Sequence, residues 1–521
     1  MDNNLGIKRA LISVYDKSGI LDLAKTLARF NIEILSTGGT AKFLTENNLK
    51  VTNVSDVTGF PEILGGRVKT LHPKIHGGIL AKRENKDQMG ELSAHGISPI
   101  DMVVVNLYPF EKTVAAPDVS LAKALENIDI GGPCMIRAAA KNFPGVVVIT
   151  SPDFYNQIIQ ELQANNGSVS YNLRQKLALA AFQRTSQYDV AIADYLSSIE
   201  KEPSSMPETV HLNLHKIQNL RYGENPHQAA AYYADAASSL PPGTGKQLHG
   251  KELSFNNILD MNAAIGLSQE FVQPCAIVLK HSNPCGAAID DDIVKAYENA
   301  FKTDSVSAFG GIVSFNREVN KKVAEMMSKV FLEVIVAPSF SPEALEILTK
   351  KKNLRLIEWQ GNLDLSQEYD IKKVVGGYLL QGMDVGGDDE KKYRVVTNRQ
   401  PTEEEWAAMR FGWKVVKWVK SNAVIYVSEK QTLGIGAGQM SRVDSSRFAV
   451  QKSKDAGLSL KGSVVISDAF FPFRDGVDAA AEAGAAAIIQ PGGSIRDQQV
   501  IDAANEHNMA MVFTGVRHFR H

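Results

Sequence analysis

A lysine and a histidine stand side by side at the end of an apolar run in the middle of the chain. The run Ala276–Leu279 has the length and composition of a buried strand, and Lys280 and His281 follow it without a polar transition. An imidazole can remove a proton near neutral pH, and an ammonium group can stabilise a developing oxyanion. Because ligands bind at the carboxyl ends of strands in α/β sheets, the pair predicts a catalytic site. The alternative is a solvated lysine beside a turn histidine.

The residues that follow this pair predict a turn and then a helix. Asn283–Gly286 contains asparagine, proline and glycine, which are the residues of turns. Asp290 or Asp291 predicts the N-cap of a helix whose apolar face begins at Ile293. Lys280 would then lie between a strand end and a helix entry.

A second group of candidate residues lies in the first 150 positions. Ser36–Thr40 has the sequence STGGT and stands between a predicted strand, Ile32–Leu35, and a predicted helix. Hydroxyl groups, glycine N–H groups and a helix amino terminus together favour a phosphate. The same residues fit a helix cap with a turn equally well, so both interpretations stay open.

Three further loops concentrate polar side chains. Arg67–Lys74 contains three cations and a histidine, Asn106–Pro109 ends a predicted strand, and Ile128–Gly132 precedes a predicted helix. On that helix Arg137 and Lys141 lie four residues apart and therefore share a face. Each loop alone fits a solvated surface. Together they predict an anion site with an aspartate, a tyrosine and two lysines available for proton transfer.

The elements that must position these residues belong to a large α/β protein. A chain of 521 residues is too long for one ordinary core, so two or three domains are expected. Predicted strands at Arg9–Tyr15, Met102–Val105 and Gly145–Ile149 alternate with helical patterns and indicate a doubly wound parallel sheet. The strand–turn–helix–strand order around Lys280 recurs over Ser463–Ile489, which predicts two related α/β units in the carboxy-terminal part.

A charged segment separates these two parts. Glu200–Val210 contains two prolines and lacks apolar periodicity, which is typical of a linker. We therefore predict a first domain over residues 1–199, a linker over residues 200–210 and a second domain over residues 211–521. Leu433–Arg442 is glycine-rich but does not match a dinucleotide-binding fingerprint, because its third glycine is displaced and no acidic ribose partner is evident.

Composition argues against several classes of protein. A net charge of −2 argues against general nucleic-acid binding. The amino-terminal residues lack the apolar core of a signal peptide, and no run is long enough to span a membrane. Cys134, Cys275 and Cys285 are too few for a disulfide framework or a four-cysteine zinc site. We therefore expect a cytoplasmic protein that binds small molecules, with no nucleic-acid or membrane partner.

The loops of the first domain resemble a known family. RVKTLHPKIHGGIL, NLYPF and IDIGGPCMIRAAAKN are similar to the inosine monophosphate (IMP) cyclohydrolase domain of the bifunctional purine biosynthesis enzymes, and STGGTAKFL is similar to their methylglyoxal-synthase-like phosphate loop. The resemblance implies that Lys69, Tyr108, Asp129 and Lys141 surround the ring-closing atoms. The residues implied to hold the nucleotide and its phosphate are Ser13, Lys17, Ser36, Thr37, Gly38, Gly39, Thr40, Arg67, Thr70 and Asn106.

The second domain resembles the formyltransferase domain of the same family. The similar segments are collinear: LRYGENPHQ, KHSNPCG, SNAVIY, GIGAGQMSR, SDAFFPFRDG and RHFRH. The resemblance implies two cytidine-deaminase-like subdomains. A deaminase zinc site needs His-x-Glu and paired cysteines, whereas Ser282 and Asn283 follow His281 and no Cys-x-x-Cys is present. The expected fold class is α/β: a methylglyoxal-synthase-like doubly wound parallel sheet, then two deaminase-like subdomains without a metal.

The resemblance implies the last two steps of de novo purine synthesis. A formyl group passes from 10-formyltetrahydrofolate to the 5-amino group of 5-aminoimidazole-4-carboxamide ribonucleotide (AICAR), giving formyl-AICAR (FAICAR), which then cyclises to IMP with loss of water. His281 is the expected base, Lys280 the electrophilic partner and Asn422 an orienting group. The resemblance also implies a homodimer.

Binding residues of the second domain are carried over in the same way. The residues implied to bind AICAR are Arg221, Tyr222, Gly310, Glu333, Arg442, Phe470 and Arg517, and those implied to bind folate are Pro472, Phe473 and Asp475. Glu333 stands where the family pattern leads us to expect an aspartate. Met509–Thr514 predicts a buried strand, so we expect the tail Arg517–His521 to be ordered at a sheet edge.

Two other functions stay open at this point. A metal-dependent nucleobase deaminase is disfavoured by the missing ligands. A regulatory nucleotide sensor would need the phosphate loop but not the proton-transfer residues Lys69, Tyr108, Asp129 and Lys141.

Overall fold

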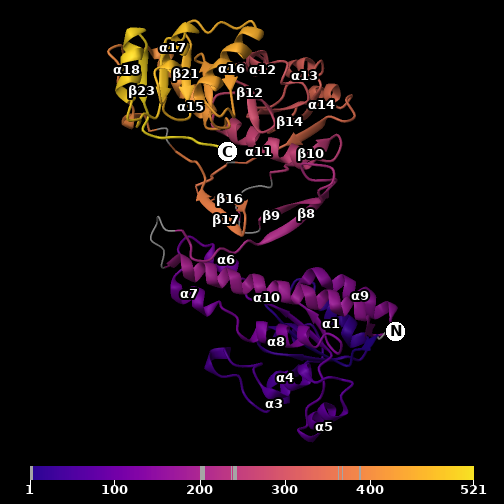
Figure 1. The fold of residues 1–521 in the computed structure, drawn as a ribbon. Helices are drawn as coiled ribbons and strands as arrows, with labels where there is room; N and C mark the ends of the chain where they lie inside the picture. The colour runs from indigo at the N-terminus through magenta and orange to yellow at the C-terminus, as the bar shows by residue number, and fades with distance from the viewer. Residues whose placement is uncertain are drawn as a thin grey trace. The chain divides into compact units, whose positions relative to one another are not determined.

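The computed structural model describes residues 4–199, 206–235, 238, 243–361, 363–366, 368–386 and 389–521. The chain divides into two units, Met1–Asn213 and Leu214–His521 (Figure 1). The predicted linker Glu200–Val210 lies partly outside the described residues, so its bounds stay a prediction.

The first unit is built on a parallel sheet of five strands. Its strand order is β4-β3-β2-β5-β6, and every pair is parallel. The strands are β2 (Arg9–Val14), β3 (Glu33–Ser36), β4 (Thr52–Asn53), β5 (Met102–Asn106) and β6 (Val147–Ile149). Met102–Val105 is buried throughout, as expected for a strand covered on both faces. The predicted doubly wound parallel sheet is confirmed.

Helices cover this sheet and close its core. The long helix α10 (Tyr171–Ile199) packs on α8 (Gly131–Lys141) and β6. Its buried residues Leu177, Ala181, Thr185 and Tyr188 recur at three- to four-residue spacing and form one stripe. The other elements are β1 (Leu5–Gly6), α1 (Ile20–Arg29), α2 (Gly38–Glu46), α3 (Val54–Thr58), η1 (Leu64–Gly66), α4 (Pro73–Leu80), α5 (Lys86–Ala94), α6 (Phe110–Val114), α7 (Leu121–Glu126), η2 (Pro152–Phe154), α9 (Tyr155–Ala164) and β7 (Ser168–Val169).

The strand order creates a switch point at one edge of the sheet. From β2 the chain continues to β3 on one side, whereas β5 pairs with β2 on the other. At such a point the loops leaving the carboxyl ends of two strands diverge and leave a crevice for a ligand. The predicted residues after β2, β3 and β5 lie on the loops at this edge or in the first turn of α2.

The second unit contains two sheets of six strands with the same order. The first is β10-β15-β14-β13-β11-β12 and the second is β18-β23-β22-β21-β19-β20. The first set comprises β10 (Lys246–His249), β11 (Cys275–Lys280), β12 (Asn283–Ile289), β13 (Gly311–Phe315), β14 (Leu332–Ala337) and β15 (Arg355–Glu358). The second comprises β18 (Arg394–Val395), β19 (Val424–Val427), β20 (Thr432–Gly436), β21 (Val464–Ser467), β22 (Ala487–Gln490) and β23 (Ala510–Phe513). Two related α/β subdomains are thus confirmed.

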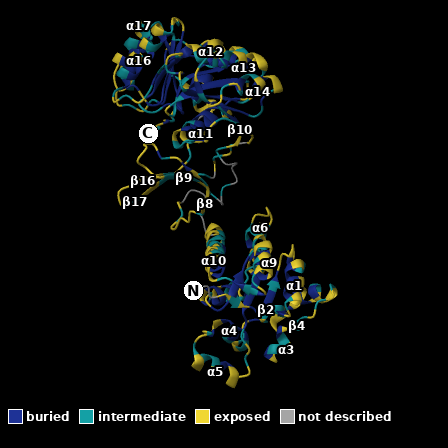
Figure 2. Cartoon of the chain, turned by 90° about the vertical axis from the view of Figure 1, so that its right-hand side faces the viewer, coloured by how far each residue is buried: buried dark blue, intermediate teal, exposed yellow. Residues whose placement is uncertain are grey.

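A shared core joins the two sheets. α11 (Phe255–Gln269) and α15 (Glu403–Val416) contribute buried residues to one cluster together with the inner faces of both sheets. The outer faces pack on α12 (Ile293–Thr303), α13 (Lys321–Met327) and α14 (Pro342–Leu348) in one half, and on α16 (Arg442–Asp455), α17 (Asp475–Glu482) and α18 (Asp497–Glu506) in the other. Buried strands inside covering helices are visible in Figure 2. Two hairpins, β8 (Leu214–Leu220) with β9 (Ala230–Asp235) and β16 (Tyr369–Val374) with β17 (Gly377–Gly382), and the short η3 (Glu390–Lys392) complete the unit.

The turn predicted at Asn283–Gly286 is wrong. These residues begin β12, which pairs antiparallel with β11, and the chain reverses at His281 and Ser282. Gly286 is there for packing: a Cβ on it would lie 1.8 Å from the carbonyl oxygen of Ala300 in α12. The N-cap of α12 is Asp292 rather than Asp290 or Asp291, and its side chain accepts a hydrogen bond from Val294 N.

The predicted alignment of the two related units is also wrong: it is shifted by one position in the sheet. Strand order equates β11 with β19 and β13 with β21. The strand Ser463–Ile466 therefore corresponds to β13 and not to the strand that ends at Lys280. Gly434 and Gly436 in β20 approach the backbone of α16 as Gly286 approaches α12, which explains the glycine-rich segment without a nucleotide.

Candidate active sites

The edge of the first sheet is tied together by side chains from the ends of β3 and β5 and from the first turn of α2. Thr40 Oγ1 accepts a hydrogen bond from Val14 N at 3.1 Å and lies 3.0 Å from Val14 O. Asn106 Oδ1 accepts from the backbone N–H groups of Tyr15 and Asp16 at 2.6 and 3.0 Å. Ser36 Oγ donates to Ile12 O. These predicted nucleotide-binding residues therefore shape the loops around the edge as well as lining it.

The predicted phosphate loop is the first turn of α2. Thr37 is the N-cap residue, and Gly38 adopts a φ of 54°, which a glycine tolerates without strain. The backbone N–H groups of this turn and the helix dipole favour an anion. Thr37 Oγ1 donates to the carboxylate of Glu62, and Arg67 pairs with Glu126. Carboxylates thus contact two groups that we expect to bind phosphate.

Asp129 lies where β5 and α8 come together. Its Oδ1 accepts from Gly132 N at 2.8 Å, and a Cβ on Gly132 would lie 2.5 Å from Oδ2, so only glycine fits beside this carboxylate. Burial raises the pKa of Asp129, although hydrogen bonds and the nearby Lys69 ammonium oppose the rise. Tyr188 OH accepts from Asp129 N at 2.8 Å and donates to a backbone carbonyl, which fixes the loop.

Lys69 and the backbone of Tyr108 are both near enough to this carboxylate to lower its pKa. A Cβ on Gly38 would lie 3.6 Å from Lys69 Nζ, which places the ammonium group beside the start of α2. The ring of Tyr108 is exposed and meets that of Tyr15 edge-on, with centroids 5.6 Å apart. The side chain of Thr70 is buried beside Gly131, at the start of α8. At the same edge, Ser13 is half-buried near the end of β2, and Lys17 is exposed on the loop that follows it.

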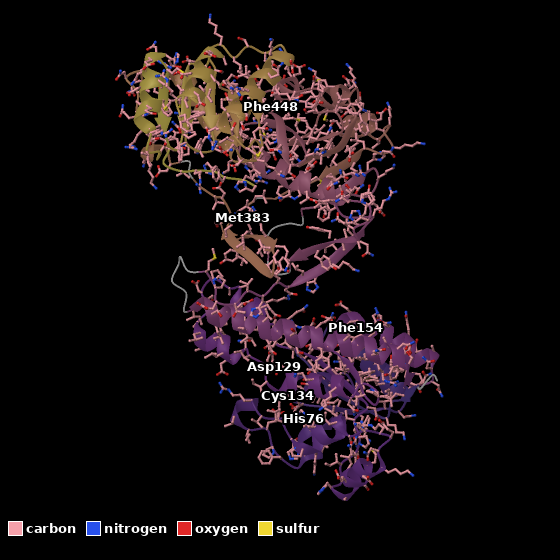
Figure 3. The ribbon with its side chains drawn as sticks, viewed as in Figure 1. His76, Asp129, Cys134, Phe154, Met383 and Phe448 are labelled. Carbon is pink, nitrogen blue, oxygen red and sulfur yellow. The ribbon has the colours of Figure 1, made fainter. Side chains whose placement is uncertain are left out.

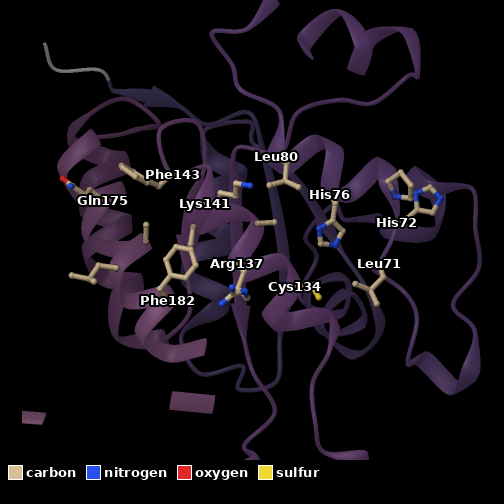
Figure 4. A pocket seen from close by; sticks show the side chains of 15 residues that line it. Leu71, His72, His76, Leu80, Cys134, Arg137, Lys141, Phe143, Gln175 and Phe182 are labelled. Atoms are coloured by element: carbon tan, nitrogen blue, oxygen red, sulfur yellow. The ribbon is translucent and has the colours of Figure 1, made fainter. Parts of the chain in front are cut away.

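Within one chain, Lys141 does not lie near Asp129 and Lys69. It ends α8, whereas Asp129 precedes the start of that helix, and ten helical steps separate the two ends by about 15 Å. Lys141 and Arg137 instead line an apolar groove of about 1130 Å³ between α4, α8 and α10 (Figure 4). Figure 3 labels Asp129, Cys134 and His76; Cys134 and His76 line that groove, whereas Asp129 does not.

In the second unit Lys280 and His281 stand at the tip of the β11–β12 hairpin. Lys280 Nζ donates to Phe309 O at 2.6 Å, and His281 is exposed. The backbone N–H groups of His281 and Ser282 both donate to the carboxylate of Asp260 in α11. The structure therefore places the predicted base and its lysine at one end of the sheet, as expected.

Asn422 and Arg442 belong to one buried network. Arg442 donates to Asn422 Oδ1 at 2.9 Å, to Asp468 Oδ1 at 2.6 Å and to Phe470 O at 3.1 Å. Burial lowers the pKa of Arg442 and raises that of Asp468, while their mutual attraction opposes both shifts. Ser421 Oγ donates to the second oxygen of Asp468.

The carboxy-terminal tail packs against this network. His518 N donates to Asp468 O, and Ser421 exchanges hydrogen bonds with the backbone of Arg520. His518 is buried and its ring contacts Asp384. Arg517 lies over the ring of Phe519 at 4.2 Å. The tail is thus held by specific contacts along its length.

The remaining predicted binding residues lie on several loops. Glu333 in β14 accepts from Asn257 Nδ2 at 2.9 Å, and Gly310 N donates to Phe331 O. Arg221 lies over the ring of Tyr222 at 5.5 Å. Exposed members of the segment after β21 are Phe470, Pro472, Phe473 and Asp475.

Several residues that support these sites were missed from the sequence. Arg496 lies over the ring of Phe473 at 4.5 Å, and Asp260, Asp468 and Tyr188 hold loops of the candidate sites. Each acts on a segment far away in the chain, so no local pattern identifies it. The available signal was that Arg496, Asp260 and Asp468 stand next to apolar residues in the sequence.

The described residues lack two features that would point to other functions. No group of three or more His, Cys, Asp or Glu side chains in the described ranges could hold a metal ion. Within the same ranges no helix has both the length and the apolar character needed to cross a bilayer.

Comparison with known families agrees with this architecture. A sequence profile described as MGS-like domain matches residues 19–134, and one described as AICARFT/IMPCHase bienzyme matches residues 139–452. The chain belongs to the AICARFT/IMPCHase bienzyme family. A curated member, the bifunctional purine biosynthesis protein PurH of Magnetococcus marinus, is 53% identical over 99% of both chains.

Membership of the AICARFT/IMPCHase family confirms the resemblance found in the loops. The chain is a bifunctional AICAR formyltransferase and IMP cyclohydrolase, and it acts in the last two steps of purine biosynthesis. The deaminase and the nucleotide sensor are thereby set aside. A solved structure titled "Crystal structure of ForH" is 35% identical and covers 37% of this chain and 100% of its own, with a TM-score of 0.35.

Proposed function

We propose that the first unit closes the purine ring at the edge formed by β2, β3 and β5. One observation carries the proposal: a helix amino terminus with Gly38 in its first turn lies beside the ammonium group of Lys69, and that group acts in turn on the half-buried carboxylate of Asp129. The helix start would hold the nucleotide phosphate. The lysine and the carboxylate would then face the reacting atoms.

The chemistry required there is modest. The carboxamide nitrogen of FAICAR attacks the formyl carbon and a C–N bond forms. The formyl oxygen then leaves as water with one proton from the carboxamide nitrogen and one from the formamido nitrogen, which becomes doubly bonded to the former formyl carbon. Both partners belong to one molecule, so positioning supplies much of the rate. We assign Asp129 the orientation of the carboxamide N–H, and Lys69 and Tyr108 the exchange of protons. Lys141 receives no step in this scheme because it lies at the far end of α8.

As the pH is lowered, cyclisation should begin to lose activity at a higher pH than it would if Asp129 had the pKa of an ordinary aspartate. Burial raises the pKa of Asp129, and a carboxylate must be ionised to accept the amide N–H, so acidification removes this acceptor sooner. The acid limb of the cyclisation rate, measured on supplied FAICAR, should therefore lie above the ordinary aspartate value of about 3.9. Asp118→Asn, at an exposed position, should keep this limb, whereas Asp129→Asn should abolish it; a limb unchanged by Asp129→Asn contradicts the assignment.

We propose that the second unit transfers the formyl group at the β11–β12 hairpin. The nitrogen of the AICAR 5-amino group bonds to the formyl carbon while His281 removes a proton from that amino group. The ammonium group of Lys280 stabilises the oxyanion that forms. Collapse of this intermediate breaks the bond to the folate nitrogen, which takes up a proton. Asn422 orients the nucleotide from the neighbouring loop, because Lys420 N donates to Asn283 Oδ1 in the hairpin.

The substrates would bind on either side of this hairpin. The family activity requires a folate-type formyl donor, and we propose 10-formyltetrahydrofolate, with Phe473 and its partner Arg496 forming an aromatic and cationic wall. The buried guanidinium of Arg442 and the nearby Phe470 support an AICAR site on the same side as Asn422. Arg517 in the ordered tail supplies a further planar donor for phosphate.

The assignment of the two reactions to the two units is tested by the products formed. Wild-type enzyme given AICAR and 10-formyltetrahydrofolate should release IMP, measured by absorbance after chromatography. Lys69→Ala should stop at FAICAR, which accumulates, because only the first unit is damaged. The exposed Lys42→Ala, on α2 but paired only with Glu46, serves as the matched control and should give IMP. Normal IMP release by Lys69→Ala would contradict the assignment.

Three other properties are proposals from the resemblance. We propose a homodimer, activity without a metal, and a cytoplasmic location. Sedimentation of the purified enzyme and elemental analysis after chelation test the first two. A monomeric enzyme, or bound metal whose removal abolishes activity, would contradict them.

A further inference from the structure

The hairpin that presents His281 turns in an unusual way. Lys280 pairs with Asn283, so the loop between β11 and β12 consists of His281 and Ser282 alone. Their φ angles are 51° and 60°. Two-residue hairpin loops with positive φ at both positions are normally formed by Asn-Gly or Gly-Gly, because other residues are strained there. This turn therefore needs an external support.

Asp260 supplies that support from α11. Its Oδ2 accepts from His281 N at 3.2 Å, and its Oδ1 accepts from Ser282 N at 2.7 Å and from Ser282 Oγ at 3.2 Å. Both carboxylate oxygens thus hold the two residues that adopt left-handed backbone. Without the carboxylate, the two N–H groups would lose their partners and the strained turn could relax.

The second side of the hairpin is fixed independently. Asn283 Oδ1 accepts a hydrogen bond from Lys420 N at 2.9 Å. Lys420 precedes Asn422 by two residues, and the side chain of Asn422 bonds to Arg442. A turn held on one side by α11 and on the other by the loop before β19 has a defined position relative to the Arg442 network. The imidazole of His281 is thereby placed as well.

We propose that Asp260 is a positioning residue for formyl transfer, which holds the His281–Ser282 turn and so aims the imidazole at the amino group of AICAR. This inference rests on the proposed role of His281 as the base. Asp260 acts through the backbone and has no step in the proton transfer. Its loss should therefore lower kcat for transfer and leave the KM for AICAR nearly unchanged.

A graded pair of variants tests the contact itself. Asp260→Ala removes both acceptors and should lower kcat for formyl transfer by about 10²-fold, the scale of a displaced catalytic group. Asp260→Asn keeps one acceptor oxygen and should give a smaller loss. Cyclisation of supplied FAICAR should be unchanged in both. Asp292→Ala is the matched control, since this aspartate also accepts a backbone N–H but caps α12 instead of the turn.

A second substitution should rescue the first. Glycine adopts positive φ at no steric cost, so Ser282→Gly in the Asp260→Ala background lowers the need for the carboxylate. The double variant should regain about tenfold in kcat, the scale of one left-handed residue's penalty. Ala288→Gly, within β12, should give no rescue in the same Asp260→Ala background.

The outcomes separate this inference from the proposed function. Transfer by Asp260→Ala at the wild-type kcat, beside an inactive His281→Ala enzyme, overturns the positioning role alone. An active His281→Ala enzyme overturns the base assignment instead. A loss in Asp260→Ala that Ser282→Gly leaves unrescued, or that appears equally in Asp292→Ala, assigns Asp260 to general folding and also overturns the inference.

Discussion

Replacing His281 with alanine should lower the rate of formyl transfer by about 10²–10⁴-fold, the cost of losing a general base. The amine of AICAR is a poor nucleophile because its lone pair is delocalised into the ring and the carboxamide, so its proton must leave as the new bond forms. Cyclisation of supplied FAICAR should be unchanged, because all residues proposed for that step lie in the first unit. The two rates are measured separately, with AICAR plus 10-formyltetrahydrofolate and with FAICAR alone.

His249 offers a matched control for this substitution. It lies on β10, at the opposite edge of the sheet from the β11–β12 hairpin, and its ring nitrogen lies 3.2 Å from the carbonyl oxygen of Lys351. His249→Ala should retain near wild-type transfer. Transfer by His281→Ala within a few-fold of the wild-type rate would show that another group is the base.

The grouping of candidate residues at one edge of the first unit follows from parallel-sheet geometry. Each candidate loop follows a strand or precedes a helix, and the carboxyl ends of parallel strands share one edge. Ser36–Thr40, Asn106 and Asp129 therefore had to approach one another once the strands were recognised. The separation of Lys141 from Asp129 within one chain could not be predicted, because a shared helix face says which residues lie on one side and not how far apart they lie along the helix.

The hairpin at His281 could not be derived from local signals. Pro284 and Gly286 are turn residues by frequency, but Pro284 stands in an edge strand, where its missing N–H is tolerated, and Gly286 permits the close approach of α12. Glycine serves turns and close packing alike, and only the position of a distant helix decides between them. The true turn has no glycine because Asp260 supports it from another element.

A second ambiguity, the repetition of one element order, explains the wrong alignment of the related units. A strand–loop–helix–strand order occurs several times in each subdomain, so sequence order alone fits β11 to β21 as well as to β19. Sheet pairing removes the ambiguity, since β11 and β19 are the strands with antiparallel partners on both sides. The glycines of β12 and β20, which both approach a helix, mark the correct register.

Removing the carboxylate of Asp468 should destabilise the second unit by about 3–5 kcal/mol, the cost of leaving a buried charge without its partner. Asp468 is 0% exposed and pairs with the guanidinium of Arg442, whose side chain is 8% exposed. In Asp468→Ala the guanidinium would remain among buried groups without a counter-charge. Denaturant unfolding of the wild type and the variant measures the difference. Glu325→Ala, which breaks an exposed ion pair with Lys321, should cost only about 0–1 kcal/mol.

A second substitution separates the effect of the orphaned charge from that of lost packing. Arg442→Met in the Asp468→Ala background removes the unpaired guanidinium, so the double variant should be more stable than Asp468→Ala alone. It should still transfer formyl groups poorly, because Arg442 is proposed to bind AICAR and to orient Asn422. Stability would thus recover while transfer does not, which a purely structural role for the pair does not allow. If the double variant is as unstable as Asp468→Ala, the loss comes from the bonds of Asp468 to Ser421 and the tail, and the buried charge is not its cause.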